Sequence, residues 1–171
     1  MRVFLLVILS LTLSACGFHL RGAMNLPFQT IYVDSGGAPA VGAELALGVR
    51  TGSNTRLTNT PAEAEAVLQV MNEGQERRIL SLSGGGRVRE YELIYRVSFR
   101  LLDREKRELL PTQLIELKRD MSYDDAQVLA KEAEAALLYT DMRTDAAQQI
   151  MRRVSAVKLS FNNERLPAAR P

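Results

Sequence analysis

The one cysteine and the one histidine of the chain lie three residues apart, in the stretch LTLSACGFHL at residues 11–20. A thiol beside an imidazole can act as a nucleophile with its base, or as half of a metal site. Both kinds of chemistry need further side chains, and no cluster of His, Cys and Asp in the sequence has the spacing of metal ligands. The residues that precede Cys16 therefore decide how the pair is interpreted.

Residues 1–15 have the layout of a secretory signal peptide, with Arg2 at the start, an apolar run over 3–13 and the small residues Ser14 and Ala15. The apolar run has about 11 residues, whereas a helix that spans a bilayer needs about 20, so a transmembrane anchor is the weaker alternative. The end of the run, Leu-Ser-Ala-Cys, resembles the bacterial lipobox. In that motif the cysteine thiol is acylated and the cysteine becomes the new N-terminus.

Cys16 is therefore predicted to carry lipid, which excludes it as a nucleophile, a metal ligand or a disulfide partner. The alternative is an unmodified residue of the signal peptide. Several acyl chains on one residue make a stable anchor, because each buried CH₂ contributes ~0.8 kcal/mol and one chain alone is marginal. Residue 17 is Gly rather than the Asp that resembles an inner-membrane retention signal, which points to the outer membrane. His19 then belongs to the linker, and no catalytic role is predicted for it.

Without residues 1–15 the chain retains 156 of its 171 residues, enough for one domain with a core. Apolar residues make up 46% and charged residues 25%, which is ordinary for a soluble fold, and a net charge of +2 is too small to indicate nucleic-acid binding. We expect a lipidated linker at residues 16–27, one domain at 28–160 and a disordered tail at 161–171. With a single cysteine, the domain has no disulfide.

The clearest pattern in the chain lies in the segment REYELIYRVSFRLLD, residues 89–103. Apolar side chains alternate there with mostly polar ones, at Tyr91, Leu93, Tyr95, Val97, Phe99 and Leu101. A period of two indicates an antiparallel strand with one buried face. Val97 and Phe99 are therefore expected to face the core together unless the strand carries a bulge.

Three further strands are expected, at residues 28–35, 64–82 and 114–123. The second of them is expected to be interrupted near Gly74, because glycine weakens a strand. Residues 51–63 are polar and are predicted to form a loop.

Two helices complete the set. In residues 39–49 the apolar residues Val41, Leu45 and Val49 recur every four positions, which indicates one face of a helix. A long helix is expected over about 124–157, with acidic residues suited to its start. One stripe of this helix is apolar, at Leu138, Met142, Ala146, Ile150, Val154 and Val157.

The order strand, helix, three strands, helix predicts an α+β fold. The first strand–helix–strand unit should cross over right-handed between parallel neighbours, and the three later strands can form an antiparallel meander. The expected architecture is a two-layer sandwich, with two helices packed on one face of a four-stranded mixed sheet.

The sequence contains no motif that assembles a nucleophile with a base, so an enzyme is not predicted, and an envelope hydrolase remains only a weak alternative. The stretch SGGGR at residues 83–87 has the glycines of a phosphate loop. A phosphate loop leads into a helix, however, whereas this stretch leads into the strongest predicted strand. We interpret it as a hairpin turn, and we expect no cofactor and no metal.

Four stretches carry a family resemblance that extends over nearly the whole chain after residue 15. They are CGFHLRG (16–22), IYVDSG (31–36), REYELIYRVSF (89–99) and AAQQIMRRV (146–154). The chain resembles the LPS-assembly lipoprotein family LptE, formerly called rare lipoprotein B. The first stretch is the specific one, since the family reads Cys-Gly-aromatic-His-Leu-Arg there.

The resemblance implies an outer-membrane lipoprotein with the sandwich fold described above. It implies that the protein sits in the lumen of a large β-barrel, the LPS-assembly protein LptD. Together the two proteins place lipopolysaccharide in the outer leaflet of the outer membrane. The lipoprotein is needed for assembly of the barrel, plugs its pore and has been proposed to bind lipopolysaccharide.

The same resemblance suggests which residues contact lipopolysaccharide. Lys131 in VLAK matches the family's Ala-Leu-Ala-Lys. The family's other basic residue aligns near Gly84, so its role passes to Arg87 or Arg89. If the predicted strands 64–82 and 89–103 pair, these arginines gather with Arg77 and Arg78 at one hairpin end. The alternative is that the arginines are ordinary exposed charges. Lys131 has the same alternative, an ordinary exposed lysine of the helix.

Two functions of different classes remain open. One is a plug and assembly partner inside an outer-membrane barrel, as the family resemblance implies. The other is a free-standing periplasmic lipoprotein that binds a lipid or another envelope component without a barrel. Stable co-purification with a barrel distinguishes them.

Overall fold

The computed structural model describes residues 24–157. Cys16, His19 and the predicted tail at residues 161–171 therefore lie outside the described residues, as do the last three residues of the predicted domain. None of the helices in the described part of the chain is long and apolar enough to cross a membrane.

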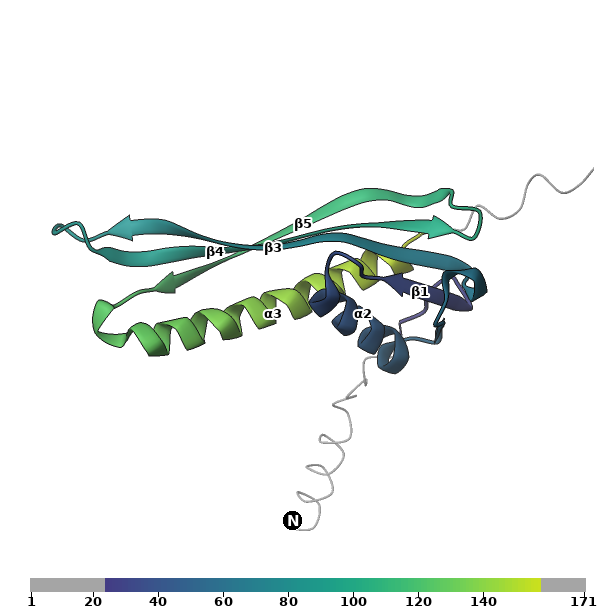
Figure 1. Cartoon of the computed structure of the whole chain (residues 1–171), viewed down its shortest axis with the longest axis horizontal. Helices are drawn as coiled ribbons and strands as arrows, with labels where there is room; N and C mark the ends of the chain where they lie inside the picture. The colour runs from purple at the N-terminus through teal and green to yellow at the C-terminus, as the bar shows by residue number, and fades with distance from the viewer. Residues whose placement is uncertain (1–23, 158–171) are drawn as a thin grey trace, which may run out of the picture.

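The described chain folds into strands and helices in the order shown in Figure 1. The regular elements are β1 Thr30–Asp34, α2 Pro39–Gly52, β2 Arg56–Leu57, β3 Ala66–Leu82, β4 Val88–Asp103, β5 Glu108–Ser122 and α3 Val128–Ser155. Short 3₁₀ turns at Pro61–Glu63 and Asp125–Gln127 precede β3 and α3. The Asp124 side chain accepts a hydrogen bond from the N–H of Ala126, which caps this last turn.

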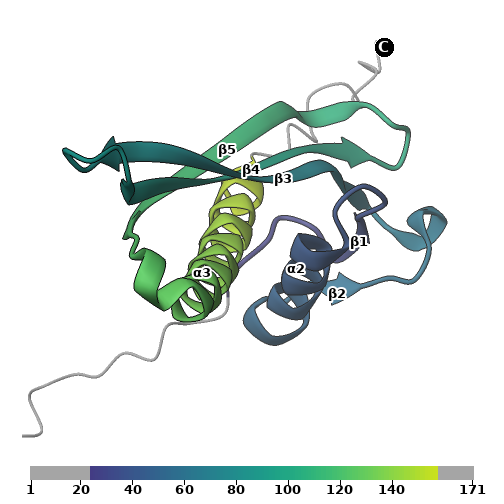
Figure 2. The same ribbon diagram turned by 60° about the vertical axis from the view of Figure 1, so that its left-hand side comes forward.

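The strands form one mixed sheet in the order β2-β1-β3-β4-β5. β1 lies parallel to both β2 and β3, and β3, β4 and β5 form an antiparallel meander. Both helices lie on the same side of this sheet (Figure 2). The predicted α+β sandwich with two helices on one face of a mixed sheet is thus confirmed.

The predicted number of four strands was wrong, because the sheet has five. The additional strand β2 pairs Arg56 and Leu57 with Thr30 and Ile31, inside the segment predicted as a loop. A strand of two residues has no period that sequence reasoning can detect. It forms because its backbone completes hydrogen bonds that β1 offers, with Thr58 N donating to the carbonyl of Ile31 at 2.9 Å.

Two boundaries within the meander also differ from expectation. The predicted interruption at Gly74 was wrong, because Gly74 pairs with Arg96 inside a continuous ladder and the irregularities lie instead beside Val70 and Ile79. β5 begins at Glu108, six residues before the predicted start. The polar residues and Pro111 in that part of β5 hide the strand pattern, but an edge strand tolerates proline because its outer side needs no N–H.

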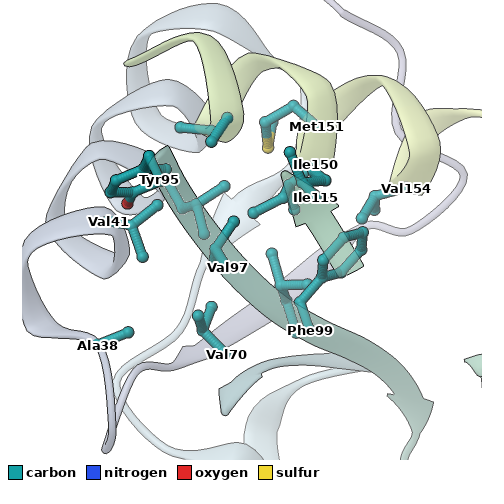
Figure 3. Packing of buried hydrophobic residues seen from close by; sticks show 14 of the residues in the cluster. Ala38, Val41, Val70, Tyr95, Val97, Phe99, Ile115, Ile150, Met151 and Val154 are labelled. Carbon is teal, nitrogen blue, oxygen red and sulfur yellow. The ribbon is translucent and has the colours of Figure 1, made fainter. Parts of the chain in front are cut away.

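The core lies between the sheet and the two helices (Figure 3). Val97 and Phe99 are both buried in it, so they share a face as expected. The helix faces predicted from spacing also hold, since Val41, Leu45 and Val49 of α2 are fully buried. The stripe on α3 is buried at Met142, Ala146, Ile150 and Val154.

The meander and α3 continue beyond this core. α3 has 28 residues and so spans about 42 Å. Its first turns lie beside the far ends of β3 and β4, at the left of Figure 1. We call this part of the molecule, made of the β3–β4 turn, the end of β5 and the first turns of α3, the distal end.

Candidate functional site

The distal end begins with the β3–β4 turn at SGGGR. Ser83 N donates to the carbonyl of Arg87 at 2.7 Å and Gly86 N donates to the carbonyl of Ser83 at 2.9 Å. Gly86 has a φ of 77°, which glycine adopts without a steric cost. The turn joins two antiparallel strands. The interpretation of this stretch as a hairpin turn rather than a phosphate loop is thus confirmed.

Arg87 is the last residue of the turn, Arg89 lies at the start of β4, and both are exposed. Within residues 24–157 neither guanidinium forms an ion pair. The carbonyl of Arg89 accepts a hydrogen bond from Tyr123 N at 2.7 Å, which holds the end of β5 beside it. Two positive charges are therefore presented to solvent on a hydrogen-bonded frame.

Lys131 is brought to the same end by the first turn of α3. Its Nζ donates to Ser122 Oγ at 3.0 Å and to Glu134 Oε2 at 2.9 Å. Ser122 pairs across the sheet with Glu90, the neighbour of Arg89. The Lys131 side chain is only 15% exposed. It is therefore less exposed than an ordinary helix lysine, and it joins α3 to β5.

The two arginines before the turn have carboxylate partners. Arg77 donates to both oxygens of Glu132, at 2.7 and 3.0 Å, and its guanidinium lies 5.2 Å from the centre of the Tyr91 ring. The hydrogen bond with Arg77 lowers the pKa of Glu132. Arg78 pairs with Glu76. Arg77 and Arg78 lie opposite Leu93 and Glu92, further along the strands from the turn than Arg89, and both have carboxylate partners. Arg87 and Arg89, in contrast, form no ion pair among the described residues.

Sequence reasoning missed the partners that stabilise this end. The Tyr91 and Tyr123 rings meet edge to face, with centres 5.0 Å apart and planes at 78°. Glu132 and Tyr139 belong to α3, and the Tyr139 hydroxyl donates to the carbonyl of Glu76 in β3 at 2.7 Å. These contacts join residues that are 55 and 63 positions apart, so no local pattern could reveal them.

Large apolar side chains are exposed on the elements that form the distal end. Ile79, Leu80 and Leu82 lie near the end of β3, and Leu129, which is 87% exposed, lies in the first turn of α3. Guanidinium groups suit the bidentate recognition of phosphate. Exposed apolar side chains next to them suit acyl chains. The arrangement can therefore bind an anionic amphiphile, whereas residues 24–157 contain no His, Cys, Asp and Glu grouping that could hold a metal.

The sheet face opposite the helices has a different character. Ile94 of β4 points to this face and is fully buried, although no helix covers it. Around it, long charged side chains from β3, β4 and β5 form a continuous network of ion pairs. In order along the network these are Arg78, Glu76, Arg96, Glu116, Lys118 and Glu92. This ion-pair network gives the molecule a broad polar surface of mixed charge.

Comparison with known proteins supports the resemblance seen in the sequence. The family model LptE, described as lipopolysaccharide-assembly, matches residues 28–154. The chain is 27% identical to the LPS-assembly lipoprotein LptE of Yersinia enterocolitica, over 91% of this chain and 75% of that protein. It is 28% identical to the protein of the same name from Pectobacterium atrosepticum, over 91% of this chain and 86% of that protein.

Solved structures agree with this assignment. The solution structure of lipoprotein B from Nitrosomonas europaea is 46% identical, with a TM-score of 0.71 over 82% of this chain and 91% of that chain. The crystal structure of rare lipoprotein B from Shewanella oneidensis is 30% identical, with a TM-score of 0.63 over 72% of this chain and 92% of that chain. Because the family model covers most of the sequence and its core, the chain belongs to the LptE family of lipopolysaccharide-assembly lipoproteins.

Proposed function

We propose that the protein is an outer-membrane lipoprotein that assembles with the LPS-assembly β-barrel LptD, plugs its lumen and supports the insertion of lipopolysaccharide into the outer leaflet. In this proposal residues 1–15 are removed as a signal peptide. Cys16 carries the lipid, residues 16–27 form the linker and residues 28–160 form the domain in the barrel. The protein acts by binding and needs no cofactor and no catalytic residue.

Ligand binding in this proposal rests on the exposure of Arg87 and Arg89 and on their lack of ion pairs. Both guanidinium groups are exposed and have no carboxylate partner within residues 24–157, whereas Arg77 and Arg78 are paired. Lipopolysaccharide carries phosphates and acyl chains, and the distal end offers guanidinium groups beside exposed leucines. We call Arg87, Arg89 and Lys131 the basic cluster. Lys131 becomes available to a ligand when a phosphate replaces Glu134 as its partner.

The plug part of the proposal is supported by the ion-pair network on the opposite sheet face. The lumens of outer-membrane barrels are polar, so a plug needs a polar surface that matches them in shape. A face of alternating charges fits such a wall better than it fits a lipid phase. The family membership supports the same role.

A pull-down of the tagged, lipidated protein in detergent from outer membranes tests this proposal. We expect a large β-barrel protein to co-purify in a stable complex and to be identified as the LPS-assembly barrel. Recovery of the protein alone, with bound lipid but no barrel, would instead support the free-standing periplasmic lipoprotein. The same preparation can be assayed for lipopolysaccharide, which separates ligand binding from assembly.

A further inference from the structure

A second apolar face runs along α3, separate from the face that packs on the sheet. Its side chains follow one another at spacings of three and four residues, and none of them is charged. In the first half of the helix they are exposed, with Leu129 at 87% and Leu137 at 68%. We call the exposed side chains of this face the free stripe: Leu129, Ala133, Ala136, Leu137 and Thr140.

The second half of α3 continues this face, but α2 covers it there. Thr144, Ala147 and Met151 keep the same spacing, and the last two are nearly buried. The contact with α2 is close, since a Cβ placed on Gly48 would lie 4.0 Å from Met151 Cγ. The same face of α3 therefore already packs against a helix in its second half.

α2 reaches only to the middle of α3. The N–H of Val41, in the first turn of α2, and the Arg143 side chain both donate to the carboxylate of Glu73, so these two points lie level. The contact at Gly48 lies further along both helices, so the helices run in the same direction. Figure 1 shows α2 beside only the second half of α3. Within residues 24–157 the free stripe therefore has no helix beside it over its length of about 16 Å.

A groove of about 560 Å³ joins the free stripe to α2. Its walls include Glu44 and Leu47 of α2 and Thr144 and Met151 of α3, and Leu47 is 56% exposed. Thr144 lies about one turn after Thr140, the last residue of the free stripe. The exposed leucines of the two helices thus belong to one continuous surface.

We propose that the free stripe docks an amphipathic helix of a partner protein, with an apolar ridge on the stripe and Lys or Arg beside that ridge. A helix is the occupant that this face already accepts, since α2 packs on its second half. The small side chains of Ala133 and Ala136 leave hollows between Leu129 and Leu137. The ridge of a second helix fits such hollows when the two axes lie about 8–10 Å apart. This inference goes beyond the proposed function and depends on neither the barrel nor lipopolysaccharide.

The charges beside the free stripe favour a basic partner. Glu44 lines the groove, and Asp141, which directly follows Thr140, is exposed. Neither carboxylate forms an ion pair in the part of the chain that the structure describes. Lys or Arg beside the ridge of a docked helix can pair with them, as flanking charges do in coiled coils. A second copy would instead bring the same carboxylates toward one another, because an isologous contact uses the same patch on both copies.

Binding of two synthetic peptides tests the proposal. Each is a helix of about 18 residues, since shorter helices are marginal in water. Both carry the same ridge of Leu and Ala, and the residues beside the ridge are Lys in one peptide and Glu in the other. The chain over residues 16–171 is used with Cys16→Ser, so that neither lipid nor detergent competes for the peptides. By fluorescence anisotropy we expect the Lys peptide to bind at least about fivefold more tightly, because the Glu peptide replaces attraction by repulsion at two carboxylates.

Leu137→Gln tests the contact itself. Leu137 belongs to the free stripe, so this change should weaken binding of the Lys peptide at least about tenfold, the factor expected when the burial of one leucine is lost. Leu114→Gln changes a leucine of β5 that is 59% exposed, and as the matched control it should alter the affinity by less than about twofold. Asp141→Asn combined with Glu44→Gln should lower the preference for the Lys peptide over the Glu peptide.

Other results would overturn the proposal. No binding of either peptide, equal affinity for both, or equal losses in Leu137→Gln and Leu114→Gln would show that the free stripe does not dock a basic helix. A dimer in sedimentation that Leu137→Gln disrupts would make a second copy the occupant. Binding to phosphatidylcholine vesicles that the same variant abolishes would make a lipid surface the occupant. None of these measurements involves the barrel, so a failed barrel pull-down would not affect them.

Discussion

Arg143 of α3 and Glu73 of β3 form an ion pair, with Arg143 Nε 3.1 Å from Glu73 Oε1, across 70 residues of sequence. The same oxygen accepts the Tyr95 hydroxyl at 2.8 Å. The other Glu73 oxygen accepts the N–H of Val41, in the first turn of α2, at 3.4 Å. Burial and the hydrogen bond to Glu73 raise the pKa of Tyr95, so the hydroxyl keeps its proton and donates. One carboxylate thus connects both helices to two strands.

Glu73→Ala is expected to lower the free energy of unfolding by about 1.5–3 kcal/mol, the contribution of a hydrogen bond to a charged group. The Glu73 side chain is 12% exposed and that of Arg143 22%, so solvent cannot fully replace the lost partner. Urea unfolding of the domain measures the change. Glu90→Ala, which removes an exposed carboxylate of β4, is the control and should cost less than about 1 kcal/mol. Equal effects would show that Glu73 has no special structural role.

The core is expected to be sensitive at Phe99. Phe99 is fully buried between the sheet and the helices, so Phe99→Ala should cost about 3–5 kcal/mol by opening a cavity. Arg100 lies on the other face, where its Nε donates to Gln69 Oε1. Arg100→Ala should cost less than about 1 kcal/mol, because its partners are partly exposed. Similar shifts in the denaturation midpoint of the two variants would contradict the assignment of Phe99 to the core face and Arg100 to the opposite face of β4.

The β4–β5 hairpin is expected to be sensitive to acid through Asp103. Burial alone raises the pKa of this carboxyl group, but hydrogen bonds from the Arg107 N–H and side chain outweigh it and hold the pKa below its usual value. A lowered pKa in the folded state means that the charged form stabilises the fold above the usual pKa of Asp. That stability is lost as the pH falls through the folded pKa.

Asp103→Asn isolates this effect from the other carboxylates. Urea unfolding of the wild type and of Asp103→Asn is compared at about pH 7 and at about pH 3. We expect the wild type to be the more stable at the higher pH, and the difference to shrink at the lower pH. A difference that does not depend on pH would mean that the Asp103 charge does not stabilise the turn.

Lipid attachment is expected to depend on Cys16 alone. The chain has no other thiol, so Cys16→Ala should abolish acylation and leave an unprocessed or mislocalised protein. Metabolic labelling with an acyl probe measures the attachment. Ser10→Ala, within the apolar run, keeps the cysteine and serves as the control. Labelling of the Cys16→Ala protein at the wild-type level would contradict the proposed lipid attachment at Cys16.

The basic cluster is expected to separate ligand binding from assembly. The combined change of Arg87, Arg89 and Lys131 to Glu should weaken lipopolysaccharide binding strongly, because each charged hydrogen bond contributes about 1.5–3 kcal/mol. Co-purification with the barrel should persist, since a large interface does not depend on a few rim charges. Both properties are measured on one preparation.

A triple variant with the same change in charge is the control for this experiment. Arg50, Arg56 and Arg152 are exposed and lie away from the distal end. Their combined change to Glu should leave lipopolysaccharide binding close to that of the wild type. Equal losses in the two triple variants would assign the effect to net charge. Loss of the barrel in the first variant would place the basic cluster in the structural interface.

The fold could be predicted where apolar side chains repeat along one element. The alternation from Tyr91 to Leu101 and the four-residue spacing of Val41, Leu45 and Val49 correspond to buried faces in the structure. Such a pattern is local, because the period of a strand or a helix decides which side chains share a face. The position of SGGGR directly before the strongest predicted strand likewise indicated the hairpin turn, which the structure shows.

The strand count, the continuity of β3 and the start of β5 were predicted wrongly. In these places pairing between distant segments outweighs the local preference of the sequence. β2 exists because two residues complete the hydrogen bonds of β1, and β3 passes through Gly74 because β4 supplies the whole ladder opposite it. Pro111 is accommodated in β5 because that strand lies at the edge of the sheet and its pairing with β4 is irregular between Leu110 and Gln113. In each case the partner strand decides the conformation.

By itself, the sequence determined the class of fold, the faces of its long elements, the turn at SGGGR and the family resemblance, since these follow from residue types at short spacing. Only the tertiary structure decided which charges are available at the distal end. Arg77 is paired because α3 folds back and brings Glu132 to it, whereas Arg87 and Arg89 form no ion pair within residues 24–157. A side chain's type is encoded locally, but its partner is set by packing between segments that lie far apart in the chain.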